Sequence, residues 1–363
     1  MITSTSFLSG VPGLLSAKEI AATAAHVARL QRDDGQIPWF ARGHCDPWNH
    51  VEAAMALTVT GYAHEARAAY RWLAANQLGD GSWFNYYLGD WVKDARLDTN
   101  VCAYVATGVH HYVTATGDVD FARSMWPCVE RAIDFVLRWQ LGDGTIRWSL
   151  DALGRRESYA LLTGSSSIFH SLRCAVALAE RLDFTKPSWE LSAGRLGHAV
   201  AHHPGAFAPK NEFAMDWYYP VFSGALTGDA AERRINDGWE RHVMDGYGVR
   251  CVSTNDWVTA AETAECVLAL DALGLTSRAL ELFSVTRRHR RDDGAYWTGI
   301  AYPEQTIFPV GETTSYTAAA IILAADALTS SSPASGLFRH GELALPLDLA
   351  EPHCPLGELR AAP

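Results

Sequence analysis

The sequence predicts an all-α protein in which six outer and six inner helices alternate around one closed ring, an (α/α)6 toroid. Three observations predict this fold. A turn pattern recurs six times along the 363 residues, each recurrence separates an amphipathic segment from a more apolar one, and strand-like segments are short and confined to the connections. We expect residues 1–328 to form a single barrel. Residues 329–363 contain several prolines and are expected to form an extended tail packed on that barrel.

The recurring pattern is a glycine that ends a helical stretch, usually after an aspartate, with an aromatic residue following it. The glycines are Gly35, Gly81, Gly144, Gly205, Gly246 and Gly294. An Asp-Gly pair suits the left-handed turn with which helices commonly end. In the four clearest copies the following tryptophan is expected to be a packing wedge between an outer and an inner helix; these are Trp39, Trp83, Trp148 and Trp297.

The segments before the turns are amphipathic and carry Arg and Glu on one face, as helices exposed on one side do. They predict six outer helices, at Ala17–Gln31, His64–Gln77, Asp118–Trp139, Ser188–His202, Asp229–Val243 and Ser277–Arg288.

The segments after the turns are rich in alanine and apolar nearly all round, which is typical of helices packed on every side. Their small residues permit close helix packing. They predict six inner helices, at Trp48–Val59, Thr99–Tyr112, Ser165–Ala179, Met215–Leu226, Val258–Leu273 and Thr313–Leu328.

Such a ring gathers the N-termini of the inner helices at one end, where the helix dipoles favour carboxylates. Acids, amides, hydroxyls and aromatic rings precede these N-termini or lie in their first turns. Rings to stack on, polar atoms for hydroxyl groups and paired carboxylates are the composition of a carbohydrate cleft. We therefore expect the functional site at this mouth.

Glu262 is the most informative acid because it lies among small residues inside an apolar predicted helix. A buried glutamate is costly unless it is paired or faces a cavity. Asp46 is the best partner, since it precedes Pro47 at a predicted helix start. We expect both to be catalytic. The residue types alone do not fix their roles, although the apolar setting favours Glu262 as general acid and Asp46 as base. A separation of about 6.5–9.5 Å between them would predict hydrolysis with inversion.

The other mouth residues are candidates for substrate binding. They are Trp48, Asn49, His50, Trp91, Asp98, Asn100, Asp216, Trp217, Tyr218, Asp256, Trp257 and Glu312. An aspartate just before a helix is also an ordinary N-cap, so capping is the alternative role for Asp46, Asp98 and Asp256.

Composition excludes several classes of partner. The 30 Lys+Arg and 41 Asp+Glu give a formal net charge of −11, which disfavours nucleic acid and anionic membranes. The N-terminal segment does not read as a signal peptide, and no apolar run reaches the roughly 18 residues of a membrane helix. The seven cysteines include no C-x-x-C, which favours free thiols in a reducing cytoplasm. We expect a cytoplasmic monomer or homodimer acting on an oligo- or polysaccharide, with no metal and no cofactor.

The Gln…Asp-Gly…Trp turns resemble the QW-type repeats of the prenyltransferase and squalene-cyclase superfamily across most of residues 30–328. That resemblance implies a toroid of this kind. It does not extend to the chemistry, because the chain lacks the D-x-D-D acid motif of the cyclases, and the Asp/Cys/His zinc site of the protein prenyltransferases cannot be assembled from it.

Over its whole length the chain resembles more closely the mycobacterial family of 3-O-methylmannose polysaccharide hydrolases. The resemblance rests on the length, the Asp46-Pro47-Trp48-Asn49 segment, the helix that carries Glu262 and the tryptophan-rich mouth. It implies an intracellular glycoside hydrolase that cleaves internal α-1,4 linkages of a partly O-methylated mannan. Two alternatives are an isoprenoid cyclase or prenyltransferase-like enzyme, and a non-catalytic glycan-binding toroid.

Overall fold

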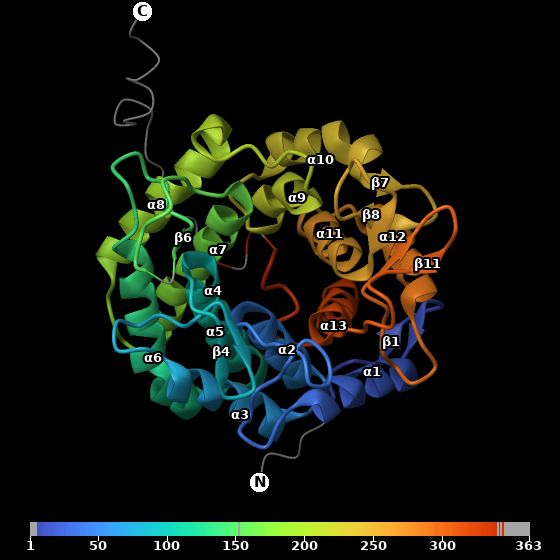
Figure 1. The fold of residues 1–363 in the computed structure, drawn as a ribbon, viewed down its shortest axis with the longest axis horizontal. Helices are drawn as coiled ribbons and strands as arrows, with labels where there is room; N and C mark the ends of the chain where they lie inside the picture. Colours follow the sequence, from blue (N-terminus) through green and yellow to red (C-terminus); the bar gives the residue numbers. More distant parts are fainter. Residues whose placement is uncertain (1–5, 152, 340, 342, 345–363) are drawn as a thin grey trace, which may run out of the picture.

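Two concentric rings of helices make up the computed structural model, which describes residues 6–151, 153–339, 341 and 343–344 (Figure 1). Around the inner ring, α2 contacts α5, which contacts α7, and the contacts continue through α9, α11 and α13 back to α2. Each of α3, α6, α8, α10 and α12 packs outside one inner helix, and α1 packs against α13 and α2. The predicted (α/α)6 toroid is confirmed.

The helix bounds follow the sequence pattern closely. The inner helices are α2 (Pro47–Val59), α4 (Thr99–Ala103) with α5 (Val105–Thr116), α7 (Leu162–Arg181), α9 (Ala214–Phe222), α11 (Ala260–Ala272) and α13 (Ser315–Thr329). The outer helices are α1 (Ala17–Leu30), α3 (Ala63–Asn76), α6 (Val119–Leu137), α8 (Pro187–His202), α10 (Gly228–His242) and α12 (Thr276–Val285). Short 3-10 segments lie at Pro204–Ala206 and Thr286–His289.

The strands are two to four residues long and all pair antiparallel. Three of the four sheets are two-stranded ribbons: β1 (Gly10–Val11) with β2 (Leu15–Ser16), β3 (Tyr86–Leu88) with β4 (Trp91–Asp94), and β5 (Leu97–Asp98) with β6 (Ser149–Leu150). The fourth sheet has the order β11-β10-β9-β8-β7, from β7 (Val243–Met244), β8 (Gly248–Arg250), β9 (Trp257–Thr259), β10 (Gly299–Ala301) and β11 (Thr306–Ile307).

Several inner helices depart from their predicted bounds: α9 ends at Phe222 instead of Leu226, and two others differ for clear local reasons. Val258 and Thr259 pair with β8 and β10 instead of opening a helix, so α11 starts at Ala260. The second inner helix is divided at Tyr104, which separates α4 from α5. Both changes keep the predicted mouth residues at the N-terminal ends of the inner helices.

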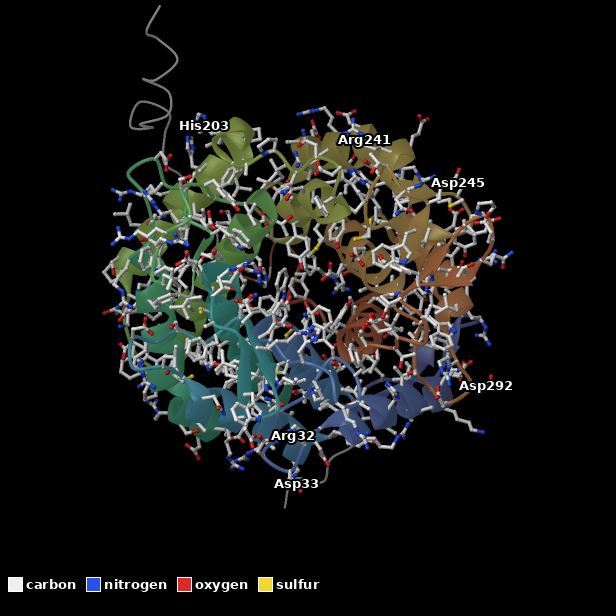
Figure 2. The ribbon with its side chains drawn as sticks, in the orientation of Figure 1. Arg32, Asp33, His203, Arg241, Asp245 and Asp292 are labelled. Carbon is white, nitrogen blue, oxygen red and sulfur yellow. The ribbon has the colours of Figure 1, made fainter. Side chains whose placement is uncertain are left out.

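The turns dock on the next outer helix. Gln77 Nε2 donates to the carbonyl of Gly81 in its own turn and to the carbonyl of Cys128 in α6, both at 2.9 Å. Gly81 has φ +96°, and a Cβ there would lie 2.1 Å from the carbonyl oxygen of Arg131 in α6. Gln31 and Gln140 repeat the pair of hydrogen bonds in their own turns. Figure 2 labels residues of several turns, and they lie along the outer edge of the ring.

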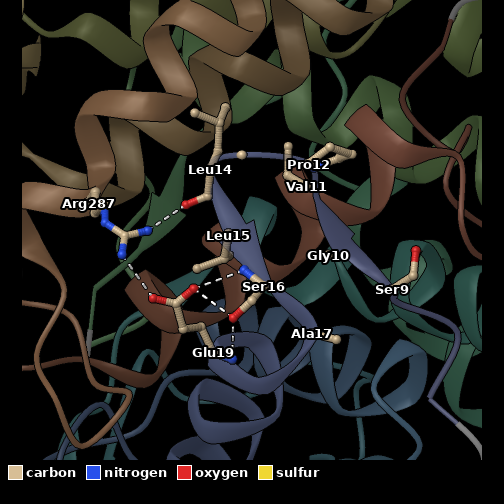
Figure 3. Close-up of a pocket in the computed structure, with 11 residues that line it drawn as sticks. Ser9, Gly10, Val11, Pro12, Leu14, Leu15, Ser16, Ala17, Glu19 and Arg287 are labelled. Atoms are coloured by element: carbon tan, nitrogen blue, oxygen red, sulfur yellow. Dashed lines mark hydrogen bonds and ion pairs between the residues drawn. The ribbon is translucent and has the colours of Figure 1, made fainter.

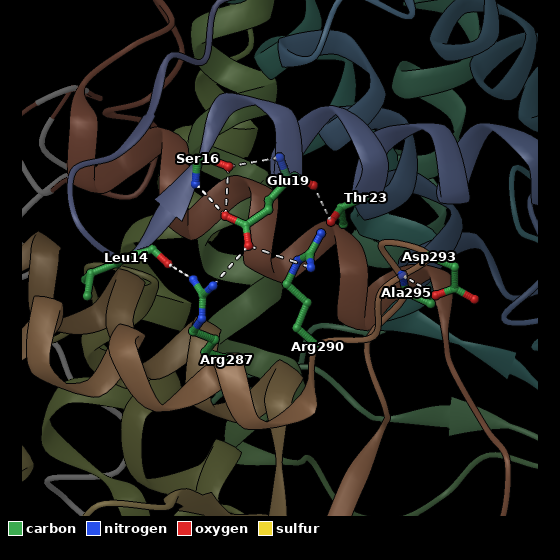
Figure 4. Close-up of polar contacts among 8 residues, drawn as sticks. All are labelled: Leu14, Ser16, Glu19, Thr23, Arg287, Arg290, Asp293 and Ala295. Carbon is green, nitrogen blue, oxygen red and sulfur yellow. Dashed lines mark hydrogen bonds and ion pairs between the residues drawn. The ribbon is translucent and has the colours of Figure 1, made fainter.

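The sixth turn closes the ring on the first outer helix. Gly294 has φ +89°, and a Cβ there would lie 2.5 Å from the carbonyl oxygen of Ala22 in α1. Arg290 stands where three of the other turns carry Gln and reaches Glu19 of α1 at 3.7 Å, while Arg287 reaches it at 3.2 Å (Figure 4). Glu19 also completes a capping box with Ser16 at the start of α1.

A cavity of about 400 Å³ lies beside this closure, lined by the β1–β2 hairpin with Glu19 and Arg287 (Figure 3). Arg287 Nη1 also donates to the carbonyl of Leu14 in that hairpin, at 2.8 Å. The closure therefore ties α1, the hairpin and the turn after α12 together.

The described part of the C-terminal segment crosses the end of the ring opposite the mouth, and Figure 1 shows it as a red trace at the centre. The Phe338 ring stacks on Phe222 at 4.2 Å and on His170 at 4.8 Å between centroids. Arg339 pairs with Asp271 at the end of α11, at 2.9 Å. The rest of the predicted tail, residues 345–363, lies outside the described residues. Within the described part of the chain, no helix combines the length and apolarity needed to cross a membrane.

Substituting Gly81→Ala tests the docking of the turns. The new Cβ meets backbone of α6 and the residue must keep a positive φ, so we expect the free energy of unfolding to fall by about 1–3 kcal/mol or more. Gly79→Ala is the matched control in the same turn, because a Cβ there has no heavy atom within 4 Å. Denaturant unfolding of both variants gives the comparison, and equal losses would contradict the docking role.

Candidate active site at the mouth of the ring

A cavity of about 540 Å³ opens at the N-terminal ends of the inner helices. Carboxylates and aromatic rings make up most of its wall, together with one arginine. Its lining is Trp39, Asp46, Trp48, Asn49, Glu52, Asn85, Tyr86, Asp94, Arg96, Asp98, Val101, Trp148, Met215, Ala261, Glu262, Glu265 and Tyr316. Both acids expected to be catalytic, Asp46 and Glu262, line this one cavity. So do the binding candidates Trp48, Asn49 and Asp98.

Asp46 is the N-cap of α2, and its carboxylate accepts three hydrogen bonds. Oδ1 accepts from the backbone N–H of Asn49 at 3.0 Å. Oδ2 accepts from Asn49 Nδ2 at 2.7 Å and from Trp39 Nε1 at 2.6 Å. Burial raises the pKa of Asp46, while these donors act to lower it. Asp46 therefore both caps α2 and lines the cavity.

Glu262 lies in the first turn of α11 and is partly buried. Burial and then the neighbouring Glu262 carboxylate raise the pKa of the Tyr316 phenol, which places Tyr316 of α13 beside this acid. The Tyr316 ring also meets the Trp39 ring edge-on at 4.9 Å, and Trp39 holds Asp46. Tyr316 thus contacts the tryptophan that holds Asp46, and its helix α13 lies between α11 and α2 in the ring.

Asp98 repeats the arrangement of Asp46 at the start of α4. It accepts from the backbone N–H groups of Asn100 and Val101, and from the indole N–H of Trp148. Burial raises the pKa of Asp98 to about 6. Two capping aspartates in the cavity wall are thus each held by a tryptophan N–H.

The expectation that all four turn tryptophans are packing wedges is wrong for Trp39 and Trp148, which line the cavity. Trp83 does act as a wedge, since it is fully buried and its Nε1 donates to the carbonyl of Leu73 at 2.9 Å. Trp39 and Trp148 each lie four residues after their glycines, whereas Trp83 lies only two after Gly81. The longer spacing carries the ring past the helix contact and into the mouth.

Among the cavity residues that were not sequence candidates are two buried glutamates, Glu52 and Glu265, which we call the acidic floor. Both are at least 90% buried, and they come from α2 and α11. Tyr104 donates to Glu52 at 3.3 Å, and the hydroxyls of Tyr218 and Tyr219 donate to Glu265, the latter at 3.0 Å. The signal that singled out Glu262, a glutamate among small residues in an apolar inner helix, applies equally to both.

The electrostatics of the acidic floor disfavour two negative charges. Burial and the charge of Glu265 raise the pKa of Glu52 well above its usual range. Burial raises the pKa of Glu265 to about 8, against the lowering effect of the Tyr218 and Tyr219 hydroxyls. The floor therefore holds at least one proton at neutral pH.

Several binding candidates lie outside the cavity and are held by the protein itself. The ring nitrogens of His50 contact the backbone of Ile37 and Ala69 at 3.1 and 2.9 Å. Tyr218 is buried and bonded to Glu265, and Asn100 is buried in α4. Asp216 accepts from Thr163, and the Trp217 indole N–H donates to the carbonyl of Arg234. Asp216 and Trp217 line a separate cavity of about 540 Å³ between α9 and α10.

The remaining candidates lie on the loops around the mouth without lining the cavity. Asp256 pairs with Arg250 at 2.8 Å. The Trp257 indole N–H donates to the carbonyl of Phe308, and Glu312 accepts from the Thr298 hydroxyl at 3.1 Å. Trp91 is 80% exposed on β4. Among the described residues, no group of three or more His, Cys, Asp or Glu is arranged to hold a metal ion.

No family model matches the chain. It is 51% identical over 334 residues to the MMP endo-(1,4)-3-O-methyl-alpha-D-mannosidase of Mycolicibacterium hassiacum, covering 92% of each chain.

Solved structures show the same fold at low identity. A glycosidase is 14% identical with a TM-score of 0.69, covering 87% of this chain and 98% of its own. A D-mannose isomerase is 11% identical with a TM-score of 0.63, covering 86% and 96%. At these identities the likeness concerns the toroid alone. The close sequence match decides the family: the chain belongs to the family of the endo-(1,4)-3-O-methyl-mannosidase, a glycoside hydrolase.

Proposed function

We propose that this chain hydrolyses internal (1,4) linkages of a 3-O-methyl-α-mannose polysaccharide, with Asp46 and Glu262 as its two catalytic carboxylates. The observation that carries the proposal is that both acids line one 540 Å³ cavity at the mouth of the ring. The name of the 51% identical relative supplies the sugar and the linkage. Neither the isoprenoid alternative nor a purely glycan-binding toroid is favoured by an acid-lined cavity in a glycosidase family.

We assign Asp46 as general base and Glu262 as general acid. Asp46 accepts from three N–H groups, which favour its ionised form, while burial makes it a stronger proton acceptor than an exposed aspartate. In this scheme Asp46 activates a water molecule that attacks the anomeric carbon, and Glu262 protonates the leaving glycosidic oxygen. Both acids line one cavity of about 540 Å³, and we propose inversion, in which the attacking water lies between the two carboxylates.

The walls of the cavity suit a methylated sugar. Trp39, Trp48, Tyr86, Trp148 and Tyr316 present aromatic rings beside the carboxylates. A methoxy group makes a sugar face more apolar, and aromatic rings bury such faces well. The carboxylates and Asn49 then serve the hydroxyl groups that remain free.

The acidic floor contributes in a different way. Because Glu52 and Glu265 hold at least one proton, they present both a donor and an acceptor to a sugar hydroxyl from one carboxyl pair. The phenols of Tyr104, Tyr218 and Tyr219 fix the orientation of these carboxyls. We assign the floor to hydroxyl recognition rather than to bond cleavage.

We place the reaction in the cytoplasm and expect a monomer or homodimer. The described cysteines are free thiols, which suits a reducing compartment.

Glu262→Gln and Asp46→Asn test the catalytic pair. Each is expected to lower kcat on a methylmannose polysaccharide by about 100- to 10,000-fold, since each removes a proton donor or acceptor from the transition state. Glu304→Gln, at an exposed position, is the control and is expected to keep full activity. Full turnover by the Glu262→Gln enzyme would end its assignment as general acid.

The stereochemical outcome is tested on the wild-type enzyme. Proton NMR of the first product formed should show the β-anomer at the new reducing end, because one displacement by water inverts an α-linkage. Initial release of the α-anomer would indicate a covalent intermediate instead.

The pH dependence of stability tests the acidic floor. Between about pH 4.5 and pH 8, folded Glu265 keeps a proton that its unfolded counterpart has released, so the free energy of unfolding falls as pH rises through this window. Glu265→Gln removes this effect, and the loss of Tm between pH 5 and pH 8.5 should be smaller than in the wild type. Glu304→Gln should retain the wild-type difference. An unchanged pH dependence in Glu265→Gln would contradict the proton assigned to the floor.

A further inference from the structure

The exposed apolar side chains are concentrated at the mouth. Among the described residues, all large apolar side chains that are at least 45% exposed lie on three loops at this end of the ring. We call them the apolar rim: Leu88, Trp91, Val92, Leu153, Phe308 and Val310. Trp91, Leu153 and Val310 are 80%, 78% and 88% exposed. The other exposed large apolar residues, Phe7, Phe184, Leu191 and Phe213, are only 37–38% exposed.

The three loops are continuous with the cavity wall. Leu88, Trp91 and Val92 belong to the β3–β4 ribbon, in which Tyr86 and Asp94 line the cavity. Leu153 follows β6 and the cavity residue Trp148.

The third loop leads into α13 and is fixed from the neighbouring sheet. Phe308 and Val310 precede α13, which carries the cavity residue Tyr316, and the Trp257 indole N–H holds the carbonyl of Phe308 at 2.9 Å. The three loops precede α4, α7 and α13. Around the ring, α13 contacts α2, α2 contacts α5, and α5 contacts α7. The rim therefore occupies one arc of the mouth.

The cavity alone is too small for a polymer. A volume of about 540 Å³ lies within the range of about 300–1,000 Å³ that encloses one small ligand. A polysaccharide that is cut internally continues on both sides of the cleaved bond, so its flanking sugars must lie on the loops outside. The most exposed apolar side chains of the described chain lie on loops that lead to this cavity, which is where the flanking sugars must lie.

We propose that the apolar rim binds the methoxy groups of sugars that flank the cleaved bond, and so favours long methylated chains. This rests on the proposed function of the cavity. Trp91 is the main contact in this scheme, because a nearly free indole offers a flat face to a sugar ring. Unmethylated mannan presents hydroxyl groups at the same positions and gains less from the rim.

The experiment compares Trp91→Ala with Leu191→Ala, an exposed apolar position on the outer helix α8. kcat/KM is measured on a long methylmannose polysaccharide, on a methylmannose oligosaccharide of three or four sugars and on unmethylated (1,4)-mannan. We expect Trp91→Ala to lose about tenfold on the long methylated chain, which corresponds to about 1.4 kcal/mol, and little on the other two substrates. Leu191→Ala should match the wild type on all three.

The outcomes separate this inference from the proposed function. If the wild type cleaves methylmannose chains but Trp91→Ala equals it on the long chain, or loses as much on the short one, the role of the rim is wrong and the proposed function stands. If the wild type cleaves no methylmannoside, both fail. Light scattering after size exclusion supplies the last comparison, because a dimer that Trp91→Ala turns into a monomer would make the rim a contact between copies of this chain.

Discussion

The docking of four of the six turns on the next outer helix is the constraint on which the rest of this structure depends. A glutamine side chain closes its own turn and binds a carbonyl of the neighbouring helix, and a glycine without Cβ lets the two backbones meet. The segment that follows each turn enters the next inner helix directly. The contact that sets the spacing of the outer ring therefore also delivers the mouth residues to one end of the inner ring.

The two weaker turns show how far this constraint extends. A Cβ at Gly205 or Gly246 would meet nothing within 4 Å, so these turns do not dock in the same way. On that side the antiparallel sheet of β7 to β11 and the hydrogen bond from the Ala214 N–H to the Cys251 carbonyl connect the units instead. The acids of the cavity come mainly from the other side and from α11, where docked turns and the closure on α1 fix the backbone. A carboxylate that must act on a bound sugar benefits from that rigid support.

The fold was readable from the sequence because the repeat depends on local chemistry. Asp-Gly turns, amphipathic outer segments and Ala-rich inner segments each predict their own element, and their alternation predicts the ring. Asp46 and Glu262 were found because helix starts and isolated acids in apolar helices are also local signals. Asp216 and His50 also lie near helix starts, but their side chains do not line the cavity. Asp216 bonds to Thr163 and His50 to backbone groups. The direction in which such a side chain points depends on packing between the repeat units.

Glu52 and Glu265 show the opposite case. Their sequence signal equals that of Glu262, yet only the tertiary structure reveals three tyrosines from two other inner helices that donate to them. The position of Trp39 and Trp148 in the cavity likewise depends on loop length after the turn, which no residue type reports. Sequence therefore identified which residues belong to the mouth more reliably than which way each side chain points.

The cavity and its surroundings form a gradient of polarity along the axis of the ring. The hydrogen-bonded glutamates Glu52 and Glu265 lie more than a turn into α2 and α11, the aspartates Asp46 and Asp98 cap helix starts, and the exposed apolar side chains lie on the loops. A plain sugar polymer would gain little from the outermost level, because its hydroxyl groups prefer water to an apolar surface. A polymer with free hydroxyls on one part of each ring and methoxy groups on another matches every level. The gradient thus favours a substrate that is itself amphipathic, and it does so independently of which carboxylate donates the proton.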